Sequence, residues 1–255
     1  MNEAQWQEVD AYLCDALVPS DPVLDEALVA SLRAGLPEHN VAPNQGKLLA
    51  LFAQLAGARR ILEIGTLGAY STIWLGRALP GDGHLDTLEA DPKHAEVARS
   101  NIANAKLQNR VTLHEGKAIE TLERFIASDT EPYDFVFIDA DKPRNPDYVR
   151  ASLQLSRPGT LIVVDNVIRG GAVVDASSVD PRVIGVRQMN ELLASESRID
   201  ATAIQTVGSN GLGRFRTLAR PRHLERRYLV RSTTGLSETR RILTPYSGAG
   251  CKGNS

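Results

Sequence analysis

The sequence lacks the features that mark several large classes of protein. It has only two cysteines in 255 residues, Cys14 and Cys251, near opposite ends of the chain, which excludes a disulfide framework and a CxxC metal site. No apolar run approaches the ~20 residues that cross a bilayer, and no signal peptide is evident. A formal net charge of −2 lacks the basic excess of a nucleic-acid binder. These absences favour a cytoplasmic small-molecule enzyme with neither a membrane nor a nucleic-acid partner.

Short apolar runs alternate with longer helical patterns through the middle of the chain. Strands are expected at 60–64, 85–88, 111–114, 135–138 and 160–164, with helices at 71–78, 92–105, 118–127 and 146–155. A helix at 180–193 and a closing pair of strands at 201–207 and 213–218 follow. This alternation predicts an α/β fold with a Rossmann-like, seven-stranded, mostly parallel sheet and helices on both faces.

The two ends of the chain have a different character from the middle. Residues 1–57 are expected to form a helical preface, with amphipathic helices near 22–33 and 43–56, that either covers the mouth of a crevice or packs against a second subunit. The preface and the core at 58–220 together form one predicted domain. From 216 to 255 there are nine Lys or Arg and two Asp or Glu, and residues 221–255 are expected to be a poorly ordered basic tail.

Two apolar runs of strand type stop abruptly at a carboxylate. Asp139 follows the run at 135–138, and Asp165 and Asn166 follow the run at 160–164. Strand carboxyl ends line the ligand crevice of a parallel sheet, so these side chains are expected to converge there. Their hard oxygen ligands suit Mg²⁺ first, with Ca²⁺ or Mn²⁺ as alternatives. One such acid is often only a loop starter or a helix cap, but the set favours a metal site.

The segment from 61 to 71 runs from a strand through a glycine-bearing turn into a helix. Its glycines, Gly65 and Gly68, do not fit the GxGxxG dinucleotide fingerprint, and Glu63 stands two residues before the first of them. A carboxylate there suits an ammonium group, and Glu89, ending the next strand, suits ribose hydroxyls. Ala118 opens a helix where an adenine would lie. This combination describes S-adenosylmethionine, although Glu63 as a solvated turn residue and Ala118 as mere packing stay open.

These motifs in combination resemble the class I S-adenosylmethionine-dependent O-methyltransferases of the caffeoyl-CoA and catechol type, particularly the bacterial members. The resemblance covers residues 21–208. It is carried by VAPxQG at 41–46, LEIGT at 62–66, LEAD at 88–91, FIDADK at 137–142 and VDNV at 164–167.

The resemblance implies a homodimeric enzyme that uses a divalent cation to methylate a hydroxyl of a catechol-like aromatic molecule. It implies that the cation is bound by Asp139, Asp165 and Asn166, and that Lys142 is the general base beside Asp139. It implies that S-adenosylmethionine contacts Val41, Glu63, Gly65, Thr66, Ser71, Glu89 and Ala118. Two departures stand out: members usually have glycine at the position of Ala69, and they close on an apolar strand where this chain has charged residues at 214–216.

Other readings of the same residues stay open. Lys142 could be a surface lysine paired with Asp141, and the segment 169–171, Arg-Gly-Gly, could be either a substrate loop or a simple connector. The chain could also be an NAD(P)-dependent oxidoreductase, a non-catalytic S-adenosylmethionine-binding protein, or a methyltransferase for a non-catechol hydroxyl or an amine.

Overall fold

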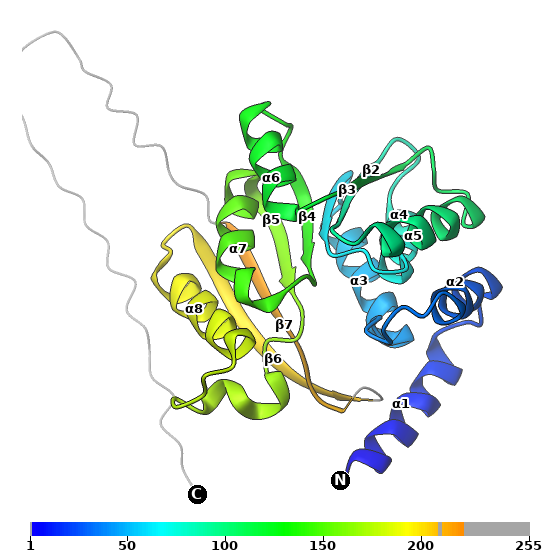
Figure 1. Cartoon of the computed structure of the whole chain (residues 1–255), viewed down its shortest axis with the longest axis horizontal. Coiled ribbons are helices and arrows are strands. Elements are labelled where there is room, and N and C mark those ends of the chain that lie inside the picture. The colour runs from blue at the N-terminus through cyan, green and yellow to red at the C-terminus, as the bar shows by residue number, and fades with distance from the viewer. Residues whose placement is uncertain (1, 209–210, 222–255) are drawn as a thin grey trace, which may run out of the picture. The chain divides into compact units, whose positions relative to one another are not determined.

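The computed structural model describes residues 2–208 and 211–221, and they form an α/β fold around one sheet (Figure 1). The seven strands lie in the order β3-β2-β1-β4-β5-β7-β6. Their bounds are β1 Arg60–Ile64, β2 His84–Glu89, β3 Val111–Glu115, β4 Tyr133–Ile138, β5 Ser156–Val164, β6 Ile199–Gly208 and β7 Gly211–Pro221. Strands β1 to β5 are parallel, and β7 pairs antiparallel with both β5 and β6. The expected mostly parallel α/β architecture is confirmed.

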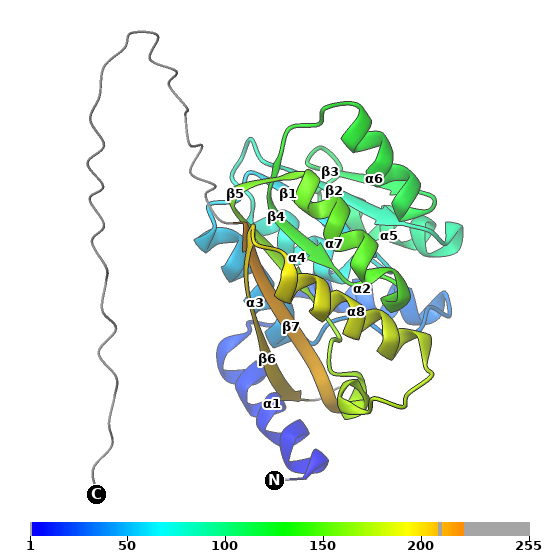
Figure 2. The same cartoon turned by 90° about the vertical axis from the view of Figure 1, so that its left-hand side faces the viewer.

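Helices cover both faces of the sheet (Figure 2). The α-helices are α1 Glu3–Leu17, α2 Pro22–Arg33, α3 Pro43–Leu55, α4 Tyr70–Ala78, α5 Pro92–Asn104, α6 Ala118–Ala127, α7 Asn145–Gln154 and α8 Pro181–Ser195, with 3₁₀ turns η1 Lys142–Arg144 and η2 Arg169–Val174. Local sequence explains where several begin. Asp21, Asp91 and Asp180 cap α2, α5 and α8 with their side chains, and in each case the next residue is a proline, whose missing N–H has no partner in the first turn.

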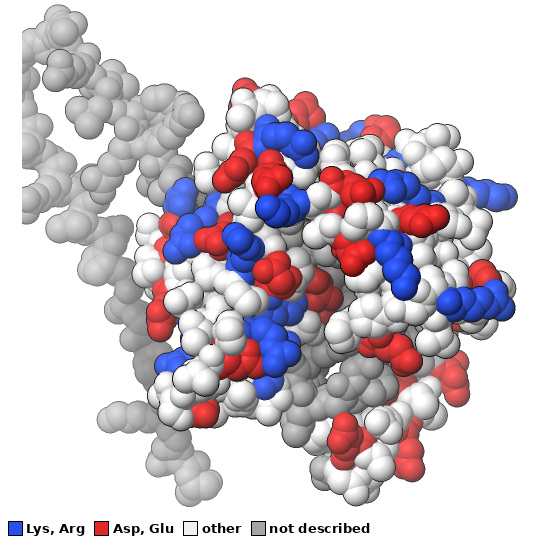
Figure 3. All heavy atoms as spheres, in the orientation of Figure 1, with Lys and Arg blue, Asp and Glu red and all other residues white. Residues whose placement is uncertain are grey.

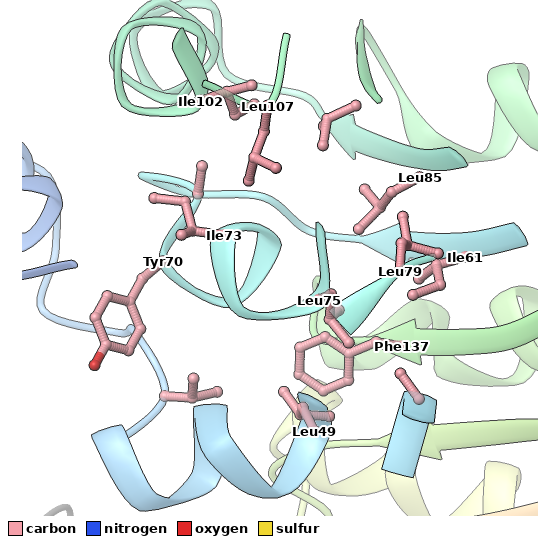
Figure 4. Close-up of a cluster of buried hydrophobic side chains, with 14 of the residues drawn as sticks. Leu49, Ile61, Tyr70, Ile73, Leu75, Leu79, Leu85, Ile102, Leu107 and Phe137 are labelled. Atoms are coloured by element: carbon pink, nitrogen blue, oxygen red, sulfur yellow. The ribbon is translucent and has the colours of Figure 1, made fainter. Parts of the chain in front are cut away.

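Alternate residues of the central strands feed two separate apolar layers. Ile61 of β1 and Phe135 and Phe137 of β4 face α3, α4 and α5 (Figure 4). Their neighbours Leu62 and Val136 face α6, α7 and α8 in the other layer. This period of two, with both sets fully buried, is what a sheet sandwiched between helices requires. The parallel pairing of β1, β2, β4 and β5 places their carboxyl ends along one edge of the sheet.

Two features differ from the sequence-based expectation, and the closing strand expected at 213–218 forms as β7. Helix α1 lies within the expected helical preface but was not predicted as a separate helix. Only Asp10 of it is buried, and its apolar residues Val9, Leu13 and Leu17, spaced four apart, stay exposed. In α3, Leu49 is buried, but Leu48, Leu51 and Leu55 are 38%, 42% and 83% exposed, so the leucines do not share one buried stripe. Strand β7 forms in spite of its charged residues.

The predicted basic tail, 221–255, lies outside the described residues except for Pro221, the last residue of β7. None of the helices in the described part of the chain combines the length and the apolar composition of a membrane-spanning segment.

Candidate active site

A cavity of about 910 Å³ opens at the carboxyl ends of the parallel strands, which is within the usual range for small-molecule sites. Six predicted cofactor contacts line it: Val41, Gly65, Thr66, Ser71, Glu89 and Ala118. The other lining residues include Asp139, Lys142 and Asn166, from the segments predicted to bind a metal and activate a hydroxyl. Glu63 and Asp165 do not line the cavity, because both are fully buried beneath it. The structure therefore brings most of the predicted residues to one hollow.

The loop between β1 and α4 is held in an unusual backbone conformation. Gly65 has φ +101°, and a Cβ there would lie 2.5 Å from the carbonyl oxygen of Asp139, so only glycine fits this close approach. Leu67 and Ala69 are also left-handed, with φ of 51° and 66°. Each such non-glycine residue costs roughly 1 kcal/mol or more. The expectation that Ala69 occupies a position favouring glycine is confirmed by its positive φ.

The carboxylate of Glu89 ties this loop to β2. One of its oxygens, Oε2, accepts hydrogen bonds from the backbone N–H groups of Thr66 at 3.3 Å and Leu67 at 2.7 Å. The other, Oε1, accepts from the N–H of Asp91 at 3.0 Å and lies 3.5 Å from Nδ1 of His94. Glu89 therefore shapes the loop as well as forming part of the cavity wall.

Glu63 is buried among three hydroxyl groups. Its carboxylate accepts hydrogen bonds from Ser71 at 2.6 Å, from Thr87 at 2.7 Å and from Thr72. Burial raises the pKa of Glu63 to about 7; the hydroxyl hydrogen bonds oppose this rise, and the negative charge of Asp139 adds to it. The reading of Glu63 as a solvated turn residue is wrong. Its contact with an ammonium group stays a prediction. In the structure Glu63 accepts a hydrogen bond from Ser71, which lines the cavity.

Asp139 and Asp165 follow neighbouring parallel strands at the same level. The register pairs Ile138 of β4 with Val164 of β5, so the next residue of each strand continues that row, with chains ~4.8 Å apart. The N–H of Asp165 donates to the carbonyl of Ile138 at 3.0 Å. Asn166 is left-handed, with φ 59°, and its N–H donates to Oδ1 of Asp165 at 2.7 Å. In the described residues no three His, Cys, Asp or Glu side chains gather as around a metal, and the predicted set has only two carboxylates and an amide.

Lys142 lies in η1 and points at Asp139. Its Nζ donates to Oδ1 of Asp139 at 2.7 Å, and both side chains are largely buried, at 8% and 16% exposure. The alternative pairing of Lys142 with Asp141 is wrong, because Asp141 instead accepts a hydrogen bond from the hydroxyl of Tyr148. Helix α8 supports η1 from behind, since a Cβ on Gly185 would lie 2.3 Å from the carbonyl oxygen of Lys142.

Sequence reasoning missed several residues of the cavity wall. They include His39 and Asn40 before α3, His94 in α5, and Arg144 and Arg182. The LEAD motif followed by a helix start signals that the first turn of α5 is near the site, but nothing in the sequence places 39–40 or 182 there. Arg169 and Gly170 of the Arg-Gly-Gly segment do line the cavity, so this segment is more than a connector.

Comparison with known proteins gives one consistent family. A family model described as O-methyltransferase matches residues 16–214. A catechol O-methyltransferase from Niastella koreensis is 50% identical over 208 residues, covering 82% of this chain and 94% of that protein. The structure of an O-methyltransferase from Bacillus cereus in complex with SAH is 52% identical, with a TM-score of 0.84, and covers 85% of this chain and 99% of that one.

A further solved structure, the O-methyltransferase TomG from Streptomyces achromogenes in complex with SAM, is 47% identical with a TM-score of 0.84, covering 87% of this chain and 99% of that one. Both solved relatives share the fold over most of this chain. Since the family model and these relatives span most of its length, the chain belongs to the O-methyltransferase family.

Proposed function

We propose that this O-methyltransferase transfers the methyl group of S-adenosylmethionine to a hydroxyl of a catechol-like small molecule, with the help of a divalent cation. The observation that carries the proposal is the single cavity that has the Gly65 loop and Glu89 at one end and the Asp139–Lys142 pair at the other. The name of the Niastella relative supports the catechol acceptor, and the ligands of the two solved relatives support the cofactor.

The cofactor is proposed to lie against the loop that follows β1. S-adenosylmethionine would supply the methyl group from this end of the cavity. The Glu89 carboxylate is placed to accept hydrogen bonds from ribose hydroxyls, as the acid at the end of the second strand does in related sheets. Val41 and Ala118 offer apolar surface on either side, and Ser71, positioned by Glu63, is the polar group nearest the predicted ammonium anchor.

The donor set at the ends of β4 and β5 fits a hard divalent cation. Asp139, Asp165 and Asn166 offer carboxylate and amide oxygens, the ligands that Mg²⁺, Ca²⁺ and Mn²⁺ take in proteins. The proposal is supported by the backbone hydrogen bond from Asn166 to Oδ1 of Asp165. A cation bound there would hold the two adjacent oxygens of a catechol and favour loss of a proton from one.

Lys142 is the proposed acceptor of the hydroxyl proton. A phenol has a pKa of ~10, so its deprotonation near neutral pH needs a nearby base or cation. The Nζ of Lys142 lies in the cavity wall 2.7 Å from Asp139. Only the neutral amine can accept a proton, and a cation held by Asp139 would replace Lys142 as the partner of that carboxylate and favour the neutral amine. The family membership gives no support to the hypothesis of an NAD(P)-dependent oxidoreductase. The hypothesis of a non-catalytic binding protein is tested by measuring whether the protein transfers methyl groups.

The decisive experiment measures methyl transfer to a panel of catechols by mass spectrometry, with Mg²⁺ and with EDTA. We expect turnover that depends on Mg²⁺ and that falls by at least about 100-fold in Asp139→Asn. Asp147→Asn, which changes an exposed acid of α7 outside the cavity, is the control and should match the wild type. Undiminished turnover in EDTA would refute the metal, and absence of turnover with every acceptor would favour the non-catalytic alternative.

A homodimer is proposed on the exposed apolar side chains of the helical preface. Tyr12 and Leu17 of α1 and Leu55 of α3 are 71%, 68% and 83% exposed, and α1 packs against α3. Large exposed apolar side chains on two packed helices are candidates for an interaction surface. Sedimentation should give twice the chain mass for the wild type and a shift towards monomer for Leu55→Glu. A monomeric wild type would contradict the proposal.

A further inference from the structure

Arg169 differs from the other cations of the cavity wall in its surroundings. It lines the cavity three residues after Asn166, and its Nε atom is shielded from solvent without a hydrogen-bond acceptor among the described residues. Burial lowers the pKa of Arg169, and the positive charge of Arg182 adds to this, while Asp180 and Asp139 oppose it. A guanidinium nevertheless stays charged in proteins. The structure therefore holds a partly desolvated positive charge with an unused donor.

The carboxylates of Asp139 and Asp180 are each paired with another cation. Asp139 accepts from Lys142 at 2.7 Å, and Asp180 is paired with Arg182, also at 2.7 Å. Within the described ranges no carboxylate comes within ion-pair distance of Arg169. The guanidinium of Arg169 is therefore left without an anionic partner in this part of the chain, and an anion that enters the cavity would supply one.

The backbone fixes Arg169 in its place. Its φ is 54°, and those of Gly170 and Gly171 are 63° and 90°. Glycine adopts this conformation without strain, so only Arg169 of the three is strained, and strained non-glycine residues cluster at binding sites. Figure 3 shows Lys and Arg side chains interspersed with acidic ones over this face of the molecule.

We propose that Arg169 binds a carboxylate of the methyl acceptor, so that the preferred substrates are catechols whose ring carries a short acidic side chain; this rests on the function proposed above. A guanidinium donates two parallel hydrogen bonds to a carboxylate. A singly charged group is favoured over a phosphate because Asp139 and Asp141 already place negative charge in the same wall. Arg144 and Arg182 line the cavity too, but Arg144 is exposed and Arg182 is taken by Asp180.

The first test compares two acceptors of nearly equal shape, 3-(3,4-dihydroxyphenyl)propionate and its primary amide. For the wild type we expect kcat/KM to favour the acid by about tenfold or more, mainly through KM, because the amide leaves the guanidinium without its anion. Arg169→Met should remove that preference by raising KM for the acid while leaving the amide nearly unchanged. Arg169→Lys should retain part of it, and Arg182→Met, which removes a cation already paired, should retain most of it.

The second test separates this inference from the chemistry. Binding of 3-phenylpropionate and 3-phenylpropionamide, which have no hydroxyl to methylate or to bind a metal, is followed by ligand-observed NMR in EDTA. The acid should bind the wild type more strongly than the amide does, and Arg169→Met should abolish the difference. If neither catechol is methylated but this binding pattern holds, the proposed function fails and the role of Arg169 stands. Equal treatment of acid and amide by the wild type, or equal losses in Arg169→Met and Arg182→Met, would overturn the proposal.

Discussion

The most informative perturbation of this protein is Glu63→Gln. Glu63 is fully buried, with its carboxylate surrounded by the hydroxyls of Ser71, Thr72 and Thr87. Glutamine keeps the size and shape of the side chain but cannot ionise. Because hydroxyl groups both donate and accept, the three neighbours can turn to satisfy the amide. The change therefore removes a buried negative charge with little change in packing.

The size of the effect follows from the pKa. Burial raises the pKa of Glu63 from 4.5 to about 7, so between these values the folded state binds more protons than the unfolded state does. The free energy of unfolding of the wild type therefore falls as pH rises through this window, and it levels off above about pH 7. A shift of about 2.5 pH units corresponds to about 3 kcal/mol. Relative to the wild type, Glu63→Gln should gain about that much stability between pH 4.5 and 7.5.

The measurement is urea denaturation of both proteins at intervals from pH 4.5 to 8. All other titrating groups are shared, so the difference between the two curves isolates Glu63. Glu123→Gln, which changes an exposed glutamate of α6, is the control and should run parallel to the wild type throughout. Parallel curves for the wild type and Glu63→Gln would refute the reasoning, because they would mean that Glu63 ionises as easily in the folded protein as in the unfolded chain.

Three further substitutions test the backbone contacts and a buried carboxylate. Gly65→Ala, whose Cβ would meet the Asp139 carbonyl at 2.5 Å, should destabilise by about 2–4 kcal/mol in urea denaturation and abolish SAH binding in calorimetry; normal binding would contradict the close approach. Asp134→Ala removes the acceptor of two N–H groups at the start of β1 and should lose about 3 kcal/mol with unchanged kcat, since it lies at the far end of β4. Gly185→Ala, which would press on the Lys142 carbonyl, should lower kcat without changing SAH affinity; an unchanged kcat would separate α8 from the position of Lys142.

The strands and most helices could be predicted because their signals are local. Apolar runs ending at glycine or aspartate mark β1, β4 and β5, while β2 and β3 are short segments with spaced apolar residues that end at glutamate. Prolines after capping aspartates mark α2, α5 and α8. The bounds of β1, α2 and α6 match the prediction. Helix α1 was not predicted as a separate helix although Val9, Leu13 and Leu17 recur at helical spacing. These side chains remain largely exposed in this chain.

The site was predicted as far as its residues follow strand ends. Asp139, Glu89 and Asn166 could be placed because the carboxyl edge of a parallel sheet is one line. The burial of Glu63 beneath the cavity could not be predicted. It depends on which face of β1 the side chain occupies and on the packing of Ser71 and Thr72 of α4 against it. Arg182, at the start of α8, also lines the cavity. Its position depends on how the η2 segment leads into α8, which no local sequence pattern predicts.

The backbone conformation of the cavity wall shows why local sequence reasoning stops here. Of the six left-handed residues other than glycine in the described part of the chain, Leu67, Asn166 and Arg169 line the cavity. Leucine and arginine have no preference for this region, so their own sequence predicts a different backbone. The N–H of Leu67 is held by the Glu89 carboxylate, and Arg169 is followed by two glycines that adopt positive φ without strain. The fold thus imposes backbone strain at residues that line the cavity. Local propensity therefore predicts the strands and helices correctly but not the backbone conformation of these residues.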